Sequence, residues 1–83
     1  MQKTIAKKTI ILYVLKLLYK GSSWENPITI AQMTNVLNSM GVECSQRTIG
    51  RNVKYLITFG LPIIRKKGNR GYFYLKERDD FFN

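Results

Sequence analysis

One stretch of this chain decides the fold: Cys44-Ser45-Gln46-Arg47-Thr48-Ile49-Gly50-Arg51-Asn52-Val53-Lys54-Tyr55-Leu56-Ile57-Thr58-Phe59-Gly60-Leu61. At ~100° per residue, one face of a helix over this stretch collects the apolar side chains Ile49, Val53, Leu56 and Ile57. The opposite face collects Arg47, Arg51, Lys54 and Thr58, with Thr48 and Tyr55 on the flank. One face can pack against the rest of a small domain, and the other offers cations.

The ends of this helix carry local signals. Ser45 is a good N-cap, because its hydroxyl can accept a backbone hydrogen bond from the first turn. Cys44 and Ile49 can form a hydrophobic staple across the same end, and Gly60 is suited to end the helix. We therefore predict a helix that starts at Gln46 and ends before Gly60. Cys44 itself is interpreted as a small apolar side chain.

Composition limits the classes of protein that fit. A chain of 83 residues supports one domain, since it buries only about 60% of its unfolded surface. Fourteen Lys and Arg against five Asp and Glu give a formal net charge of +9. This charge favours a polyanionic partner, and nucleic acid, an anionic membrane surface and an acidic protein all fit it.

The cysteine and histidine counts exclude an internal disulfide and a complete set of zinc ligands. A single cysteine cannot form an internal disulfide, and with no histidine a zinc set is incomplete, so we expect no metal and no cofactor. The most apolar segment, from Ile10 to Tyr19, is interrupted by Lys16 and too short to span ~30 Å of hydrocarbon. We expect a cytoplasmic protein with no membrane-spanning segment.

Two further helices are predicted before this stretch. Apolar residues recur at helical spacing from Thr4 to Lys20, and Gly21 ends that helix. A second helix, capped by the box Thr29-Ile30-Ala31-Gln32, runs to Met40 and ends at Gly41. Residues 28–30 before it can form a very short strand.

A β-hairpin is predicted after the third helix. Residues 61–66 and 71–75 are typical of strands, with Gly68-Asn69 between them as a two-residue turn. The chain is therefore mainly α with a small β-hairpin, in the order helix, short strand, helix, helix, hairpin. We assign residues 1–76 to one domain. Residues 77–83 form a tail, which is either a free end or the beginning of a further region.

The second half of the chain resembles a known family. The run Ser-x-Arg-Thr-Ile-x-Arg that begins at Ser45, the strand entry Gly60-Leu61-Pro62-Ile63 and the segment Gly71-Tyr72-Phe73-Tyr74-Leu75 are similar to the winged helix-turn-helix domain of bacterial WYL-type and related transcriptional regulators. The resemblance implies that the third helix is a recognition helix and the hairpin is the wing. It also implies sequence-specific binding of double-stranded DNA by a bacterial or phage regulator. Because one recognition helix covers only a few base pairs, we expect two copies to pair on DNA as a homodimer.

The recognition helix supplies most of the candidate DNA contacts. The residues at its start are predicted to face the base edges: Ser45, Gln46, Arg47 and Thr48. Those further along are predicted to reach phosphates: Arg51, Lys54 and Tyr55. The alternative is a solvated helix face, but no acidic residue lies between Ser45 and Lys76 to balance these cations.

Two further segments are candidates for phosphate contacts. The hairpin carries Lys66, Lys67, Asn69 and Arg70, which can follow the backbone or the minor groove, or simply protect an exposed edge. The start of the second helix at Thr29 can offer free N–H groups to a phosphate.

Several other features leave alternatives open. The carboxylates are scattered and His is absent, so we do not expect an enzyme. Trp24 and the run 72–74 are interpreted as core, against stacking on single-stranded nucleic acid. The first helix is interpreted as core, against a basic membrane-surface protein, and binding of RNA or acidic protein is a further alternative. Gly50 indicates a close approach to another helix or to DNA.

Overall fold

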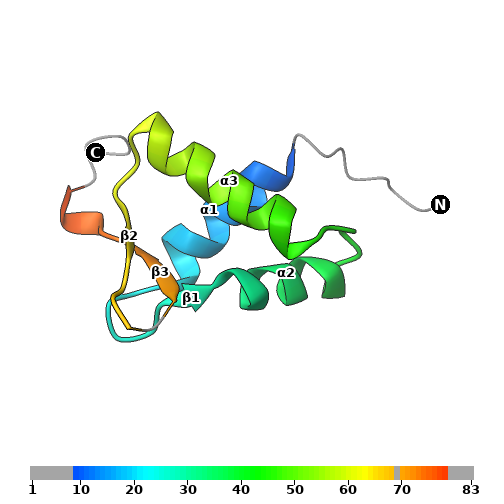
Figure 1. Ribbon diagram of the computed structural model, residues 1–83, viewed down its shortest axis with the longest axis horizontal. Coiled ribbons are helices and arrows are strands. Elements are labelled where there is room, and N and C mark those ends of the chain that lie inside the picture. The colour runs from blue at the N-terminus through cyan, green and yellow to red at the C-terminus, as the bar shows by residue number, and fades with distance from the viewer. Residues whose placement is uncertain (1–8, 69, 79–83) are drawn as a thin grey trace.

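The computed structural model describes residues 9–68 and 70–78, which form three helices and a small antiparallel sheet (Figure 1). The elements, in chain order, are α1 (Ile10–Gly21), β1 (Ile28–Thr29), α2 (Ile30–Ser39), α3 (Gln46–Phe59), β2 (Ile63–Arg65), β3 (Gly71–Tyr74) and a 3₁₀ turn, η2 (Lys76–Arg78). The predicted order is confirmed. The architecture is that of a winged helix-turn-helix.

The ends of the helices follow their local signals closely. α3 has the predicted bounds, with Ser45 as its N-cap and Gly60, at φ +115°, at its C-terminal end. α2 ends at Ser39, and Gly41, two residues further on, has a left-handed backbone with a φ of +89°. The N–H groups of Gly41 and Val42 donate to the carbonyls of α2, at 3.0 and 2.9 Å. The predicted first turns of the first helix, residues 4–8, lie outside the described residues.

The three strands form one sheet in the order β1-β3-β2, with both pairs antiparallel. β3 is therefore the central strand, although β1 precedes it by some forty positions in the chain. Arg65 pairs with Tyr72, and the Lys66 N–H donates to the Gly71 carbonyl at 2.9 Å. Gly68 then turns the chain with a φ of +78°. We call β2, β3 and the connection between them the wing.

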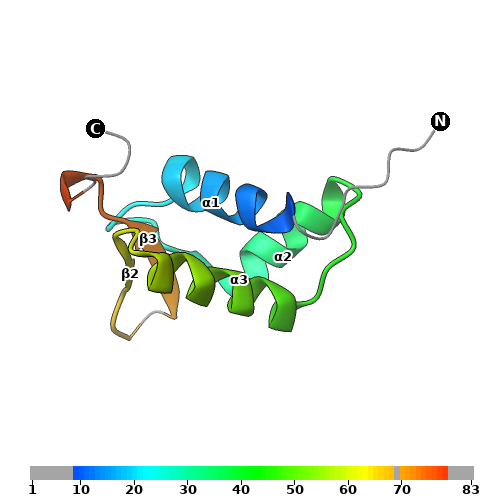
Figure 2. The same cartoon turned by 90° about the horizontal axis from the view of Figure 1, so that it is seen from above.

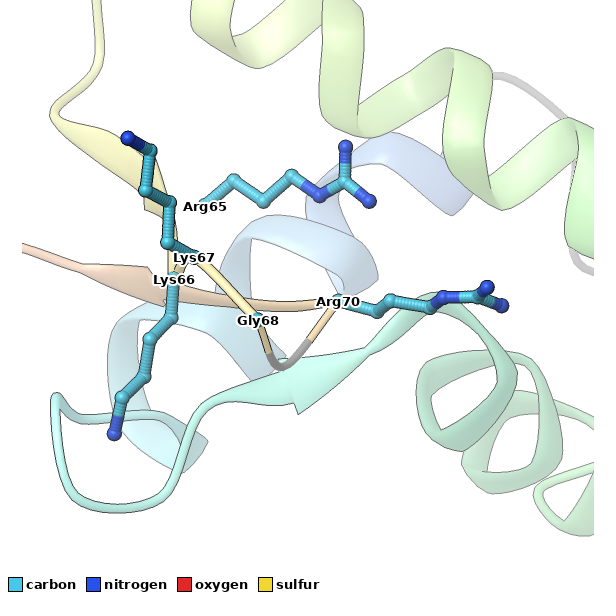
Figure 3. A pocket seen from close by; sticks show the side chains of 5 residues that line it. All are labelled: Arg65, Lys66, Lys67, Gly68 and Arg70. Carbon is cyan, nitrogen blue, oxygen red and sulfur yellow. The ribbon is translucent and has the colours of Figure 1, made fainter.

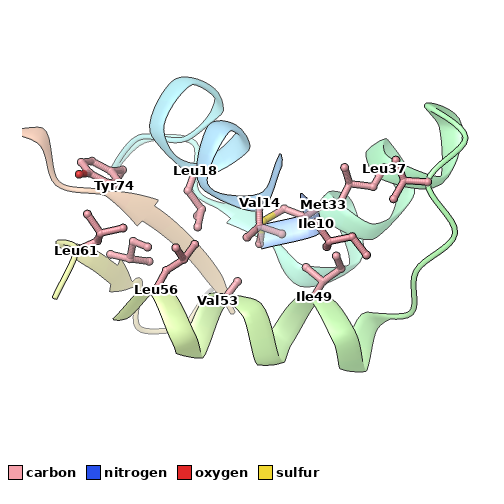
Figure 4. Packing of buried hydrophobic residues seen from close by; sticks show 12 residues of the cluster. Ile10, Val14, Leu18, Met33, Leu37, Ile49, Val53, Leu56, Leu61 and Tyr74 are labelled. Carbon is pink, nitrogen blue, oxygen red and sulfur yellow. The ribbon is translucent and has the colours of Figure 1, made fainter. Parts of the chain in front are cut away.

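The core lies where α1, α2, α3 and the sheet meet (Figure 4). Its fully buried side chains are Val14, Leu18, Met33, Leu37, Ile49 and Val53. Leu56, Leu61 and Tyr74 extend the core to the sheet. Ile57, predicted on the packed face of α3, is 41% exposed, whereas its neighbour Leu56 is buried in the core.

The aromatic residues of β3 lie on both faces of the sheet. Tyr74 belongs to the core and its ring packs edge-on against Tyr19 of α1, with centroids 4.8 Å apart. Phe73 is buried on the other face, where Trp24 covers it. The interpretation as core or partial core is confirmed for Phe73 and Tyr74, which are buried, and for Tyr72, which is half-buried against the core. It is wrong for Trp24, which is 58% exposed on the outer face of the sheet.

The apolar stripe of α1 is buried in the domain. Ile10, Val14 and Leu18 recur every four residues and are all buried against the other two helices and the sheet. In the described part of the chain, no helix has both the length and the apolar character needed to cross a membrane.

Candidate nucleic-acid interface

The start of α3 is held by hydrogen bonds between Ser45 and Thr48. The Ser45 hydroxyl accepts a hydrogen bond from the Thr48 N–H at 3.2 Å and donates to Thr48 Oγ1 at 3.1 Å. These side chains are therefore engaged in capping the helix. Gln46 and Arg47, between them in sequence, are exposed. The first turn thus presents one amide and one guanidinium group to solvent.

The rest of the outer face of α3 is cationic. Arg51 and Lys54 are exposed, and Tyr55 beside them is 54% exposed. Within residues 9–68 and 70–78, none of the cations of α3 forms a salt bridge with an acidic side chain. Asn52 is half-buried, and its amide donates to the Thr48 carbonyl at 3.0 Å. The predicted cations Arg47, Arg51 and Lys54 are thus all exposed, while the last turn of α3 carries no basic residue.

The turn between α2 and α3 fixes how the two helices meet. Asn38, near the end of α2, accepts a hydrogen bond from the Cys44 N–H at 3.3 Å, while Val42 is buried in the core. Cys44 is half-buried and packs against the core, as predicted for a small apolar side chain. Burial raises the pKa of the Cys44 thiol.

The predicted capping box at the start of α2 is confirmed. Thr29 Oγ1 accepts from the Gln32 N–H at 3.0 Å, and Gln32 Oε1 accepts from the Thr29 N–H at 2.8 Å. Two backbone donors are thus already satisfied at this end. A phosphate contact here would use the remaining N–H groups of the first turn.

The wing forms an open basic hollow of about 400 Å³ (Figure 3). Its lining residues are Arg65, Lys66, Lys67, Gly68 and Arg70. In Figure 3 the side chains of Arg65 and Arg70 extend toward α3 and α2, whereas Lys66 extends down toward the loop before β1 and Lys67 extends up, away from both arginines. Arg70 has a left-handed backbone with φ +60°. Asn69, a predicted contact, lies outside the described residues.

Two features of the wing were not predicted from the sequence. Arg65 was missed as a candidate contact, although the run Arg65-Lys66-Lys67 places three cations at the entry to the turn. The partner of Lys66 was also missed. Its amine donates to the Trp24 carbonyl at 2.8 Å and lies 4.5 Å from the centroid of the Trp24 ring. No local pattern signals a contact between residues so far apart in sequence.

The fold brings the two basic elements to one side of the molecule. In Figure 2, the wing and α3 lie on the side opposite α1. α3 and the turn of the wing therefore lie on one side of the fold, and α1 lies on the other. In the described ranges, no group of His, Cys, Asp and Glu side chains is arranged to hold a metal ion.

Comparisons with known proteins give no relatives. No protein-family model, no curated protein and no solved structure matches the chain.

Proposed function

We propose that this chain binds double-stranded DNA, with α3 in the major groove and the wing on the adjacent backbone or minor groove. The observation that carries the proposal is that the outer face of α3 and the basic hollow of the wing share one side of a winged helix-turn-helix. A major groove about 12 Å wide admits one helix, and α3, which lies on the same side as the wing, carries the exposed cations Arg47, Arg51 and Lys54.

The proposed contacts divide by chemistry. Gln46 and Arg47 are the base readers, since their exposed side chains carry the amide and guanidinium groups that pair bidentately with adenine and guanine. Phosphates are contacted by Arg51, Lys54 and Tyr55 on α3, and by cations of the wing. The start of α2 at Thr29 adds a backbone contact to a phosphate.

We further propose that the chain is a sequence-specific transcriptional regulator or the DNA-binding part of one, as its resemblance to winged helix-turn-helix regulators implies. One helix reads only a few base pairs, which discriminates poorly against an excess of competing sites. We expect a monomer or weak dimer in free solution that pairs on a two-part site or through a further region. Sedimentation with and without a selected duplex measures this, and one copy on every selected site would contradict pairing.

The decisive experiment is selection of bound sequences from a random duplex pool. Enrichment of a defined motif supports a sequence-specific regulator. Binding to all duplexes without enrichment would leave only a general DNA-binding role. Preference for single-stranded RNA over duplex DNA would favour the RNA-binding alternative.

The membrane-surface alternative is tested by circular dichroism with and without anionic vesicles. It requires the apolar stripe of α1 to leave the core, where Val14 and Leu18 are fully buried. Because the domain has this core, we expect a cooperative thermal transition without lipid. A helical signal that appears only with vesicles would contradict the DNA-binding proposal.

A further inference from the structure

The loop between α1 and β1 holds the end of β2 through one tryptophan. Lys66 Nζ donates to the Trp24 carbonyl at 2.8 Å and also lies 4.5 Å from the centroid of the Trp24 ring. The Trp24 ring in turn packs edge-on against Phe73 of β3, with centroids 5.6 Å apart and an angle of 85° between the rings. Phe73 is buried. These contacts connect both strands of the wing to the loop.

We propose that Lys66 is a positioning residue that fastens the wing to Trp24, and that Arg65, Lys67 and Arg70 contact the DNA phosphates instead. This inference rests on the proposed DNA binding and divides the cations of the wing into two roles. The carbonyl and the ring of Trp24 hold the Lys66 amine beside the loop before β1, away from the direction in which Arg65 and Arg70 extend. Lys67, the next residue, is exposed and has no such partner in the described part of the wing.

The orientation of Arg65 follows from the same contact. Successive side chains of a strand point to opposite faces, so Arg65 and Lys66 point in opposite directions where β2 ends. Figure 3 shows this arrangement, with Lys66 extending away from the side to which Arg65 extends. Holding Lys66 against Trp24 therefore keeps Arg65 on the side of α3, where a bound duplex would lie.

Lys66→Met and Lys67→Met form a matched pair, because each removes one charge from a neighbouring position and keeps an unbranched side chain. The measurement is the dependence of DNA affinity on salt, whose slope changes by about one for each phosphate that the protein no longer neutralises. Lys67→Met should flatten the slope by about one. Lys66→Met should keep the slope and lower the affinity ~2- to 5-fold at every salt concentration, because it removes a cation–π interaction and the positioning that this interaction provides.

Three variants connect the effect to Trp24. Trp24→Leu removes the ring but keeps the backbone carbonyl that accepts from Lys66, so it should also lower the affinity. Lys66→Met should cost less affinity in the Trp24→Leu chain than in the parent, because the ring contact is already lost there. Lys66→Arg should keep the affinity of the parent chain, since a guanidinium can donate to the Trp24 carbonyl and stack on the Trp24 ring. A flattened slope for Lys66→Met, equal to that of Lys67→Met, would overturn the proposal, as would an unchanged affinity.

The contact can also be measured without DNA. The ε-methylene protons of Lys66 should have an upfield NMR shift from the Trp24 ring, which Trp24→Leu should abolish. If the parent chain binds no duplex while this shift is present, the proposed function fails but the contact stands as a structural link of the wing. If the shift is absent from the free parent chain, the positioning role of Lys66 is wrong even where DNA binds.

Discussion

Gly50 of α3 lies against Ile30 of α2, so closely that a Cβ atom at Gly50 would come within 3.2 Å of Ile30 Cδ1. Glycine inside a helix costs about 1 kcal/mol relative to alanine, so its presence here needs a reason. The neighbour is the first residue of α2, rather than open solvent. Gly50 therefore lets α3 pack closely against the start of α2.

This relationship predicts a coupling between the two positions. Gly50→Ala should change the free energy of unfolding by less than ~1 kcal/mol, because the gain in helix propensity is offset by the contact with Ile30. In a chain that carries Ile30→Val, which lacks the Cδ1 atom, the same change should be more stabilising. Thermal or urea unfolding of the four chains measures the coupling. Equal effects of Gly50→Ala in both backgrounds would show that the two side chains do not compete for space.

Base reading at the start of α3 is tested by comparing two cations of the same helix. Arg47→Ala should cost ~1–3 kcal/mol on the preferred site and relax the preference at one base position. Lys54→Ala, a proposed phosphate contact, should weaken binding to all sequences about equally. The measurement is affinity for a selected and a random duplex. If Arg47→Ala weakens binding to both duplexes equally, Arg47 is not a base reader.

The wing is tested by removing the cations assigned to phosphates. Replacing Arg65, Lys67 and Arg70 together by Ala should flatten the dependence of log affinity on log salt by up to about three phosphate contacts. Stability should change little, because exposed cations contribute little to it. Titration at several salt concentrations, with thermal unfolding as the control, measures both. A parental slope in this variant would mean that these cations do not contact DNA.

Cys44 provides a test of the turn between α2 and α3. Its thiol pKa is raised by burial, so at pH 8 the folded chain carries less thiolate than the unfolded chain. Alkylation by iodoacetamide should therefore be slower in buffer than in urea at the same pH. Because the thiol pKa is higher in the folded chain than in the unfolded chain, the free energy of unfolding should fall as the pH rises through the folded-state pKa. Cys44→Ser should remove that loss, and equal alkylation rates in buffer and urea would show that the thiol is not shielded.

The sequence predicted the order of the elements and most of their ends because both depend on short-range interactions. Ser45 caps α3 through a residue three positions away, and Thr29 and Gln32 cap each other over the same spacing. The bounds of α3 were confirmed at both ends. The exposed cations of its outer face also follow from helical periodicity alone.

The tertiary structure alone decided the pairings between distant residues. Lys66 and Trp24 are 42 positions apart, and their contact depends on where the α1–β1 loop crosses the outer face of the sheet. The same packing leaves Ile57 partly exposed. A capping hydrogen bond is specified by neighbours along the chain, whereas these contacts are specified by how three helices pack around one core. For that reason the sequence determined a capped basic helix followed by a basic hairpin, and only the fold decided which cations share one side of the molecule.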